Sequence, residues 1–136
     1  RIAGPVASLP WVEKGIRGIL EDVEPSKVVL GIPFYTRLWK TGGNGTHPTS
    51  RALSMDSASA LVKEKRLEPQ WDDTLKLNVV RYSEDGYEYS MWLEDPRSIE
   101  HRLGLVKRYG LRGIAAWRRG FENSATWAEI ARLIRP

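Results

Sequence analysis

The run of residues 27–35 restricts the fold of this chain more than any other stretch, because it is β-branched and apolar without polar alternation. Such a run is typical of a strand that is covered on both faces in a parallel sheet. Residues 9–20 carry apolar side chains at helical spacing, with Ser8 as a candidate cap and Pro10 in the first turn. The two segments predict one unit in which a helix, a short loop and a buried strand follow each other.

The same order of elements returns near the end of the sequence. Asp95 and Pro96 are suited to begin a helix, and Gly110 stands where a glycine cap ends one. The strand Gly113–Trp117 follows, and a last helix, Ser124–Ile134, is expected to cover it. The side chains expected to face inward on that helix are Trp127, Ile130, Ala131 and Ile134. Two such units predict an α/β fold with a parallel sheet.

Residues 41–94, between the two units, have a different character. They predict a short helix at 55–65 and then a hairpin from two alternating segments, 76–82 and 87–93. We expect this α+β insertion to fold around its own small core. The core is expected to include Trp71, Val79, Tyr87 and Tyr89. The sequence thus divides into residues 1–40, 41–94 and 95–136.

The composition is that of an ordinary globular domain, with 136 residues, 41% hydrophobic and 28% charged. No Cys is present, which excludes disulfides and thiolate chemistry, and His47 and His101 stand far apart without a carboxylate at ligand spacing. We therefore predict no metal and no cofactor. The net charge of +4 comes without a run of like charges, and no apolar stretch reaches membrane-spanning length. Neither nucleic acid nor a membrane is predicted as a partner.

Aromatic and basic side chains gather where the two predicted strands end. Tyr35, Arg37 and Trp39 alternate to one side of an extended chain, and Trp117 ends the second strand. Function in parallel α/β sheets collects at the carboxyl ends of the strands. Sugars suit such a wall, because their CH faces stack on aromatic rings while Arg and Tyr donate hydrogen bonds to their oxygens. Packing in a core is the alternative explanation for Trp39 and for Trp117.

The order of these segments resembles one enzyme family. Residues 28–39 resemble the seventh barrel strand of family 18 chitinase-like glycoside hydrolases, whose pattern is Gly-x-Pro-x-Tyr-(Gly/Thr)-Arg, and residues 113–117 resemble the eighth, which ends in Trp. Residues 4–13 and 92–99 are similar to stretches of the spore-cortex and cell-wall members. The resemblance implies a C-terminal fragment of a (β/α)8 barrel, with strands seven and eight, their helices and the α+β insertion.

The resemblance also implies an activity for the larger protein to which such a fragment would belong. That activity is retaining hydrolysis of β-1,4-linked N-acetylglucosamine glycans, peptidoglycan or chitin-like, in which the substrate's acetamide is the nucleophile. It implies that Trp117 lies under the sugar, that Tyr35 and Arg37 line the cleft, that Trp39 stands on its rim, and that Glu122 matches an acidic position after strand eight.

The family's general acid ends an Asp-x-x-Asp-x-Asp-x-Glu motif, which this sequence lacks. We therefore predict no catalytic residue in the chain and no activity of the chain alone. The larger protein is expected in the cell wall, in the spore or outside the cell. Bare sheet edges predict oligomers or strand exchange of the isolated fragment.

Two other functions fit the sequence. One is a glycan-binding module that keeps the aromatic wall without the acid. The other is a basic interaction domain that binds nucleic acid or another anionic polymer through the helix before the second strand. Its basic residues are Arg97, Arg102, Lys107 and Arg108.

Overall fold

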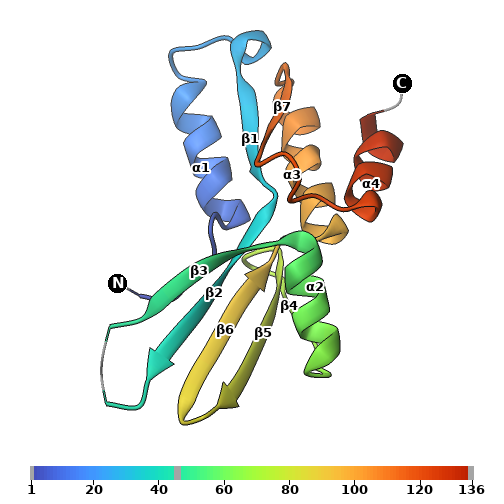
Figure 1. The fold of residues 1–136 in the computed structure, drawn as a ribbon. Coiled ribbons are helices and arrows are strands. Elements are labelled where there is room, and N and C mark those ends of the chain that lie inside the picture. The colour runs from blue at the N-terminus through green and yellow to red at the C-terminus, as the bar shows by residue number, and fades with distance from the viewer. Residues whose placement is uncertain (1, 45–46, 135–136) are drawn as a thin grey trace.

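The computed structural model describes residues 2–44 and 47–134. Two sheets and the helices around them form a mixed α/β fold (Figure 1). In chain order the elements are α1 (Leu9–Ile19), a 3-10 turn (Pro25–Lys27), β1 (Val29–Pro33), β2 (Tyr35–Gly42), β3 (Thr49–Ser54), α2 (Met55–Glu64), β4 (Gln70–Asp72), β5 (Leu77–Glu84), β6 (Tyr87–Leu93), α3 (Pro96–Tyr109), β7 (Gly113–Trp117) and α4 (Ser124–Ile134). None of the helices within the described ranges has the length and apolar character needed to cross a membrane.

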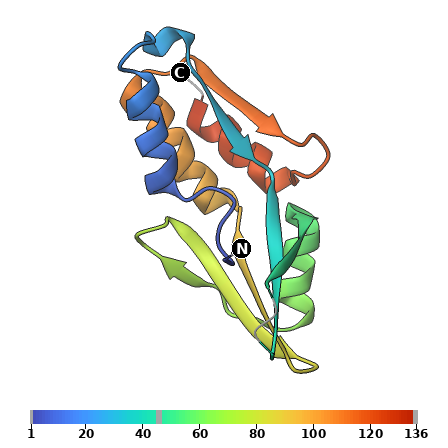
Figure 2. The same cartoon turned by 90° about the vertical axis from the view of Figure 1, so that its left-hand side faces the viewer.

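The strands β1 and β7 are parallel neighbours, as predicted, with Val29 opposite Gly113 and Pro33 opposite Trp117. The helices α1, α3 and α4 lie on one face of this pair (Figure 2). Their shared core consists of Val12, Ile16, Val28, Leu30, Ile32, Phe34, Met55, Ile99, Leu103, Leu105, Leu111 and Ile130. The expectation that both faces are covered is wrong for the described residues, because side chains alternate along β1 and Val29 on the other face is 47% exposed.

The predicted helix boundaries are confirmed by their caps. The Ser8 hydroxyl accepts a hydrogen bond from the Trp11 backbone N–H at the start of α1. Asp95 begins α3 with a reciprocal capping box to Ser98. The same helix ends at Gly110, whose φ of 63° lies in the left-handed region that glycine adopts without strain.

The last helix buries fewer of its apolar side chains than its spacing predicts. Ile130 and Thr126 are buried against the core, whereas Trp127 is 48% and Ile134 62% exposed. Trp127 contacts the edge of the Phe34 ring, with 5.6 Å between the ring centres. The prediction that Trp127 and Ile134 face inward is therefore wrong, because two strands offer too narrow a sheet to cover the whole apolar stripe of α4.

Five antiparallel strands form the second sheet, in the order β3-β2-β6-β5-β4. The predicted hairpin is β5 and β6, and it turns through Asp85 and Gly86, which both have positive φ as a tight hairpin turn requires. The predicted helix is α2, which covers one face of this sheet. The sheet begins at Tyr35 and so includes residues that the sequence assigned to the first segment, residues 1–40. The division of the chain into three parts stays a prediction.

The core under α2 differs from the expected one. Its buried members are Leu38, Leu53, Ala58, Val80, Met91 and Leu93. Of the four predicted members only Tyr89 packs against it. Val79 is buried, but it is adjacent to Val80 in the strand and therefore points to the opposite face of the sheet. Trp71 instead stacks under Arg97, and Tyr87 is 39% exposed. The alternation of side chains along each strand decides which residues face α2. The sequence alone did not show which of the two alternating sets that would be.

A buried ion pair lies where the two sheets meet. Arg102 on α3 donates to both carboxylate oxygens of Glu94, at 3.2 Å for Nε to Oε2, and its Nη2 donates to the Ala7 carbonyl at 2.6 Å. The Ser98 hydroxyl donates to the same Glu94 carboxylate at 2.8 Å. The Glu94 backbone N–H donates to the Thr36 hydroxyl at 3.0 Å. These bonds tie α3, β2 and the N-terminal segment together.

The basic interaction surface proposed for α3 is not formed as the sequence suggested. Arg102 is 1% exposed and serves the buried pair. Arg97 stacks 3.5 Å from the Trp71 ring, and Arg108 pairs with Glu13 at 2.8 Å. Arg97 and Lys107 are both exposed and have no carboxylate partner within 4.0 Å in the part of the chain described. The structure therefore removes Arg102 from the proposed basic surface, and binding of a polyanion through this helix stays a prediction.

Candidate functional site

The candidate site is built on one long extended segment. β1 passes into β2 at Phe34, and residues with even numbers from Leu30 to Leu38 are buried. The intervening residues point to the opposite side, because side chains alternate along an extended chain. They are Gly31, Pro33, Tyr35, Arg37 and Trp39. The sequence prediction that Tyr35, Arg37 and Trp39 share one side is consistent with this alternation.

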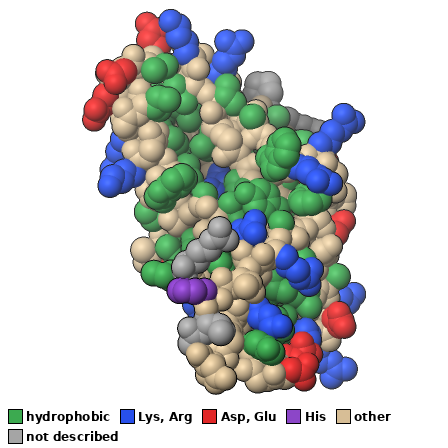
Figure 3. Space-filling view, turned by 60° about the vertical axis from the view of Figure 1, so that its left-hand side comes forward, with side chains coloured by type: hydrophobic (Ala, Val, Ile, Leu, Met, Phe, Trp, Pro, Cys, Tyr) green, Lys and Arg blue, Asp and Glu red, His purple; other side chains and the backbone are tan. Residues whose placement is uncertain are grey.

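A hollow of about 410 Å³ lies on the uncovered face of the β1–β7 pair. Its lining includes Gly31, Pro33, Tyr35, Ala115 and Trp117. Small residues at Gly31 and Ala115 leave the middle of this face open, while the rings of Tyr35 and Trp117 stand at its end. The space-filling view in Figure 3 shows apolar side chains gathered near the middle of the molecule, with Lys and Arg side chains beside and below them.

Trp117 is 70% exposed, so within the described chain it is not a core residue. Its backbone is held at the end of β7, where its carbonyl accepts a hydrogen bond from the Phe34 N–H at 2.6 Å. The peptide bond between Trp117 and Arg118 is cis, a feature that the sequence did not predict. An indole fixed at its backbone and exposed on its side chain is suited to be a flat apolar platform.

Arg37 is fixed along the wall by the neighbouring strand. Its Nε donates to the Ser50 hydroxyl at 2.9 Å and its Nη2 to the Ser50 carbonyl at 3.4 Å. Arg37 and Ser50 are brought together because Arg37 on β2 is opposite Ala52 on β3. The guanidinium has further N–H groups that can donate to a ligand. Ser50 is a supporting residue that the sequence did not single out.

Trp39 stands farther along the same strand. Its Nε1 donates to the Gly4 carbonyl at 2.7 Å, so the N–H group is already used within the chain. The ring is half-buried, and what it can offer a ligand is an apolar face. Arg37 and Trp39 are not among the residues that line the hollow, whereas Tyr35 and Trp117 are.

Glu122 lies apart from the hollow lining, in the loop between β7 and α4. Its Oε2 accepts a hydrogen bond from the Gly120 N–H at 2.7 Å. Hydrogen bonds from its own backbone N–H, from Gly120 and from the Trp127 side chain lower the pKa of this carboxyl below its ordinary value. The geometry is that of a carboxylate that stabilises a turn, and the predicted role of Glu122 in substrate binding stays a prediction.

The acidic and imidazole groups of the described residues do not assemble into a metal site, since no group of three ligand-type side chains comes together there. The lining of the hollow contains no carboxylate from the described part of the chain either. What the site offers is therefore an aromatic platform, a phenol and a fixed guanidinium. Such a set can bind and orient a polar ring compound, and none of the three groups is a carboxyl of the kind that acts in glycoside hydrolysis.

Sequence reasoning missed the Glu94–Arg102 pair, whose hydrogen bonds link α3 to the segment after β6 and to β2. A signal was present. Arg102 lies next to Leu103 and three residues after Ile99, on the face of the helix that the apolar spacing turns inward. A cation at such a position needs a buried partner, and Glu94 is placed to be that partner eight residues earlier.

This chain belongs to family 18 of the glycosyl hydrolases, because residues 6–122 match the family described as "Glycosyl hydrolases family 18". The chain is 28% identical over 123 residues to a cortical fragment-lytic enzyme of Bacillus subtilis, covering 90% of this chain and 28% of that protein. It is 29% identical over 107 residues to the cortical fragment-lytic enzyme of Bacillus anthracis, covering 78% and 25%.

Among solved structures, a chitinase from Chromobacterium violaceum superposes with a TM-score of 0.87 at 27% sequence identity. That match covers 98% of this chain and 41% of the chitinase. The chain thus spans about a quarter of the length of the curated relatives and less than half of the solved chitinase. It is similar to one portion of each of these proteins.

Proposed function

We propose that this chain forms part of the substrate cleft of a glycosidase that hydrolyses β-1,4-linked, N-acetylglucosamine-containing glycans of the peptidoglycan or chitin type. In this proposal β1 and β7 are strands seven and eight of a (β/α)8 barrel, and the five-stranded sheet with α2 is the insertion between them. The single observation that carries the proposal is the exposed Trp117 indole beside Tyr35 at the carboxyl end of two parallel strands.

The chemistry of the site suits a sugar better than a flat aromatic or a purely apolar ligand. The Trp117 ring offers a platform for the CH face of a pyranose, and Tyr35 and Arg37 offer hydrogen-bond donors for hydroxyl and amide oxygens. Arg37 is held by Ser50, so little side-chain entropy is lost when it binds. Trp39 would stand on the rim of the cleft, as the resemblance implies.

In the substrate-assisted reaction the acetamide oxygen of the bound sugar attacks its own anomeric carbon while a general acid protonates the departing oxygen. The C–O bond of the glycosidic link breaks, and water later opens the cyclic intermediate with retention. This chain would hold and orient the sugar for those steps. The proton must come from a carboxyl outside the hollow lining, because that lining has none among the described residues.

The uncovered face of the β1–β7 pair supports the barrel assignment. Val29 and Trp117 stand exposed on strands whose outer edges carry no further strand among the described residues. A closed barrel needs eight strands, and its remaining six would pair with both edges and cover this face, except at the carboxyl ends of the strands, where Tyr35 and Trp117 stand and where barrel sites lie open. An isolated chain would satisfy the same edges by oligomerisation or strand exchange.

The proposed substrate places the protein at a cell wall or spore, in line with two relatives that are named cortical fragment-lytic enzymes. The test is turnover of N-acetylglucosamine oligomers and of spore-cortex fragments by two preparations, the 136-residue chain and the full-length gene product. We expect turnover by the full-length product and none by the chain, because general acid catalysis contributes about a hundred- to ten-thousand-fold in rate.

Turnover by the isolated chain would contradict the proposal that its proton donor lies elsewhere. Saturable binding of the same oligomers by the full-length product without any turnover would instead identify a glycan-binding module. That second function is favoured by the hollow's aromatic lining, to which residues 2–44 and 47–134 contribute no carboxylate.

A further inference from the structure

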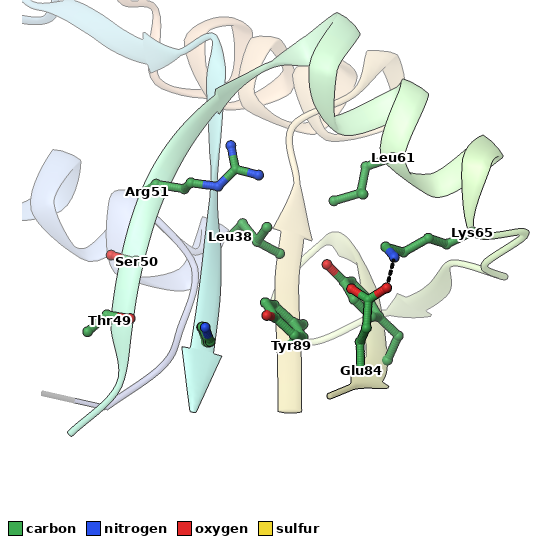
Figure 4. Close-up of a pocket in the computed structure, with 10 residues that line it drawn as sticks. Leu38, Thr49, Ser50, Arg51, Leu61, Lys65, Glu84 and Tyr89 are labelled. Carbon is green, nitrogen blue, oxygen red and sulfur yellow. Dashed lines mark hydrogen bonds and ion pairs between the residues drawn. The ribbon is translucent and has the colours of Figure 1, made fainter. Parts of the chain in front are cut away.

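A second hollow, of about 400 Å³, lies on the face of the five-stranded sheet that α2 covers, between the strands and this helix (Figure 4). It lies away from the Trp117 face because neighbours in one strand point to opposite sides. On β2, Leu38 and Lys40 line this hollow, whereas Arg37 and Trp39 belong to the other face. The lining consists of Leu38, Lys40, Thr49, Ser50, Arg51, Leu61, Lys65, Tyr82, Glu84 and Tyr89.

Two cations in this hollow have no acidic partner. Lys40 is opposite Tyr89 on β6, and Arg51 on β3 is opposite Leu38, so both side chains lie on the α2 face of the sheet. Figure 4 shows Arg51 pointing across the hollow toward Leu61. Within residues 2–44 and 47–134, no carboxylate oxygen comes within 4.0 Å of either cation.

The third cation of the hollow is already neutralised. Lys65 at the end of α2 pairs with Glu84 at 2.9 Å, and this bond crosses from the helix to the sheet (Figure 4). The hydrogen bond that Lys65 donates to the Glu84 carboxylate raises the pKa of Lys65 above its ordinary value. The lining therefore has a net positive charge that comes from Lys40 and Arg51 alone.

Two tyrosines form the floor beside these cations. The rings of Tyr82 and Tyr89 are stacked, with centres 4.7 Å apart and planes 5° from parallel. The Lys40 ammonium lies 3.9 Å from the centre of the Tyr87 ring and 6.0 Å from the centre of the Tyr89 ring. The Lys65 ammonium lies 5.0 Å from the centre of the Tyr82 ring. Burial raises the pKa of Tyr82, so its hydroxyl stays a neutral hydrogen-bond donor at neutral pH.

We propose that this hollow is a second binding site, for a saccharide that carries an anionic oxygen group, either a carboxylate or a phosphate. Lys40 and Arg51 would receive the anionic oxygens by charge-assisted hydrogen bonds, and the Tyr82–Tyr89 pair and Leu61 would contact the ring. A neutral glycan leaves both cations without an anionic partner, so it is a poorer ligand. The site is separate from the Trp117 face and does not depend on the proposed hydrolytic function.

The test uses the full-length gene product and isothermal titration with three probes. They are an N-acetylmuramic acid disaccharide with its lactyl carboxylate, N-acetylglucosamine 6-phosphate, and an N-acetylglucosamine oligomer as the neutral probe. The Lys40→Gln/Arg51→Gln double variant removes both free cations while keeping long polar side chains. Its matched control, Lys14→Gln/Lys63→Gln, removes the same charge from two exposed positions outside the hollow.

We expect at least one anionic probe to bind, roughly tenfold or more weakly in the Lys40/Arg51 variant, with the control variant unchanged. Binding of the muramic disaccharide alone would identify the carboxylate as the ligand group, and binding of N-acetylglucosamine 6-phosphate alone would identify the phosphate. Equal affinities in wild type and in the Lys40/Arg51 variant, or equal losses in both variants, would overturn the proposal. The proposal would also be overturned if neither anionic probe bound. The proposed function is tested separately, by turnover of the neutral oligomer.

Discussion

Replacing Arg102 by alanine is expected to lower the free energy of unfolding by about 3–5 kcal/mol, because it leaves the Glu94 carboxylate buried without its cation. Both side chains are 2% exposed, so water cannot replace the lost guanidinium. Burial already raises the pKa of Glu94, and the Arg102 guanidinium opposes that shift. The Ser98 hydroxyl alone would remain to stabilise the charge.

Urea unfolding of the full-length gene product measures this loss, with Lys107→Ala as the control on the exposed side of the same helix. The control is expected to change stability by no more than about 0.5 kcal/mol. A Glu94→Leu/Arg102→Met double variant should recover most of the loss, because Arg102 Nη1 has no hydrogen-bond partner among the described residues and the pair is imperfectly satisfied. An Arg102→Ala variant as stable as the control would refute the structural role of the pair.

The second large effect is expected at Trp117. One indole face of about 100 Å² transferred from water to a sugar contact is worth about 2.5 kcal/mol, which corresponds to a loss of about 70-fold in kcat/KM for Trp117→Ala. The loss should appear in kcat as well as in KM, because stacking is strongest when the sugar ring is distorted toward the transition state. Stability should change little, because the side chain is 70% exposed.

Steady-state kinetics and thermal unfolding of the same variant separate the two roles that the sequence left open for this residue. A buried Trp changed to alanine would cost about 3–5 kcal/mol and lower the Tm sharply. Trp11→Ala is the matched control, because Trp11 on α1 is 69% exposed and lies outside the hollow. Full activity of a folded Trp117→Ala variant, or a collapse of its Tm, would remove Trp117 from the site.

The sequence predicted those elements whose signals are local. Apolar periodicity, the Asp95 cap with Pro96 and the Gly110 cap placed the helices, and the Asp85–Gly86 turn placed the hairpin. Family resemblance added what local signals could not, namely the relation of this chain to the glycosyl hydrolases of family 18, which the match of residues 6–122 confirms.

Side-chain direction and pairing over long sequence distances were harder to predict. Arg102 was assigned to a basic surface because its charge is visible in the sequence, whereas its partner Glu94 is recognised only when α3 docks on the sheet. Val79 and Val80 are adjacent and equally apolar, so only the strand register decides which of them faces α2. The hollow around Lys40 arises in the same way, since it depends on which cations the fold leaves without a carboxylate.

The most direct test of the proposed cleft is to observe the tryptophan indole N–H signals of the full-length gene product by ¹⁵N nuclear magnetic resonance during titration with N-acetylglucosamine oligomers. Trp117→Phe assigns the decisive signal. We predict a saturable shift of the Trp117 signal, with the signals of Trp11 and Trp127 unmoved, because Trp117 lines the hollow and they do not. A saturable shift of other indoles with the Trp117 signal stationary would contradict the assignment of this face as the glycan site.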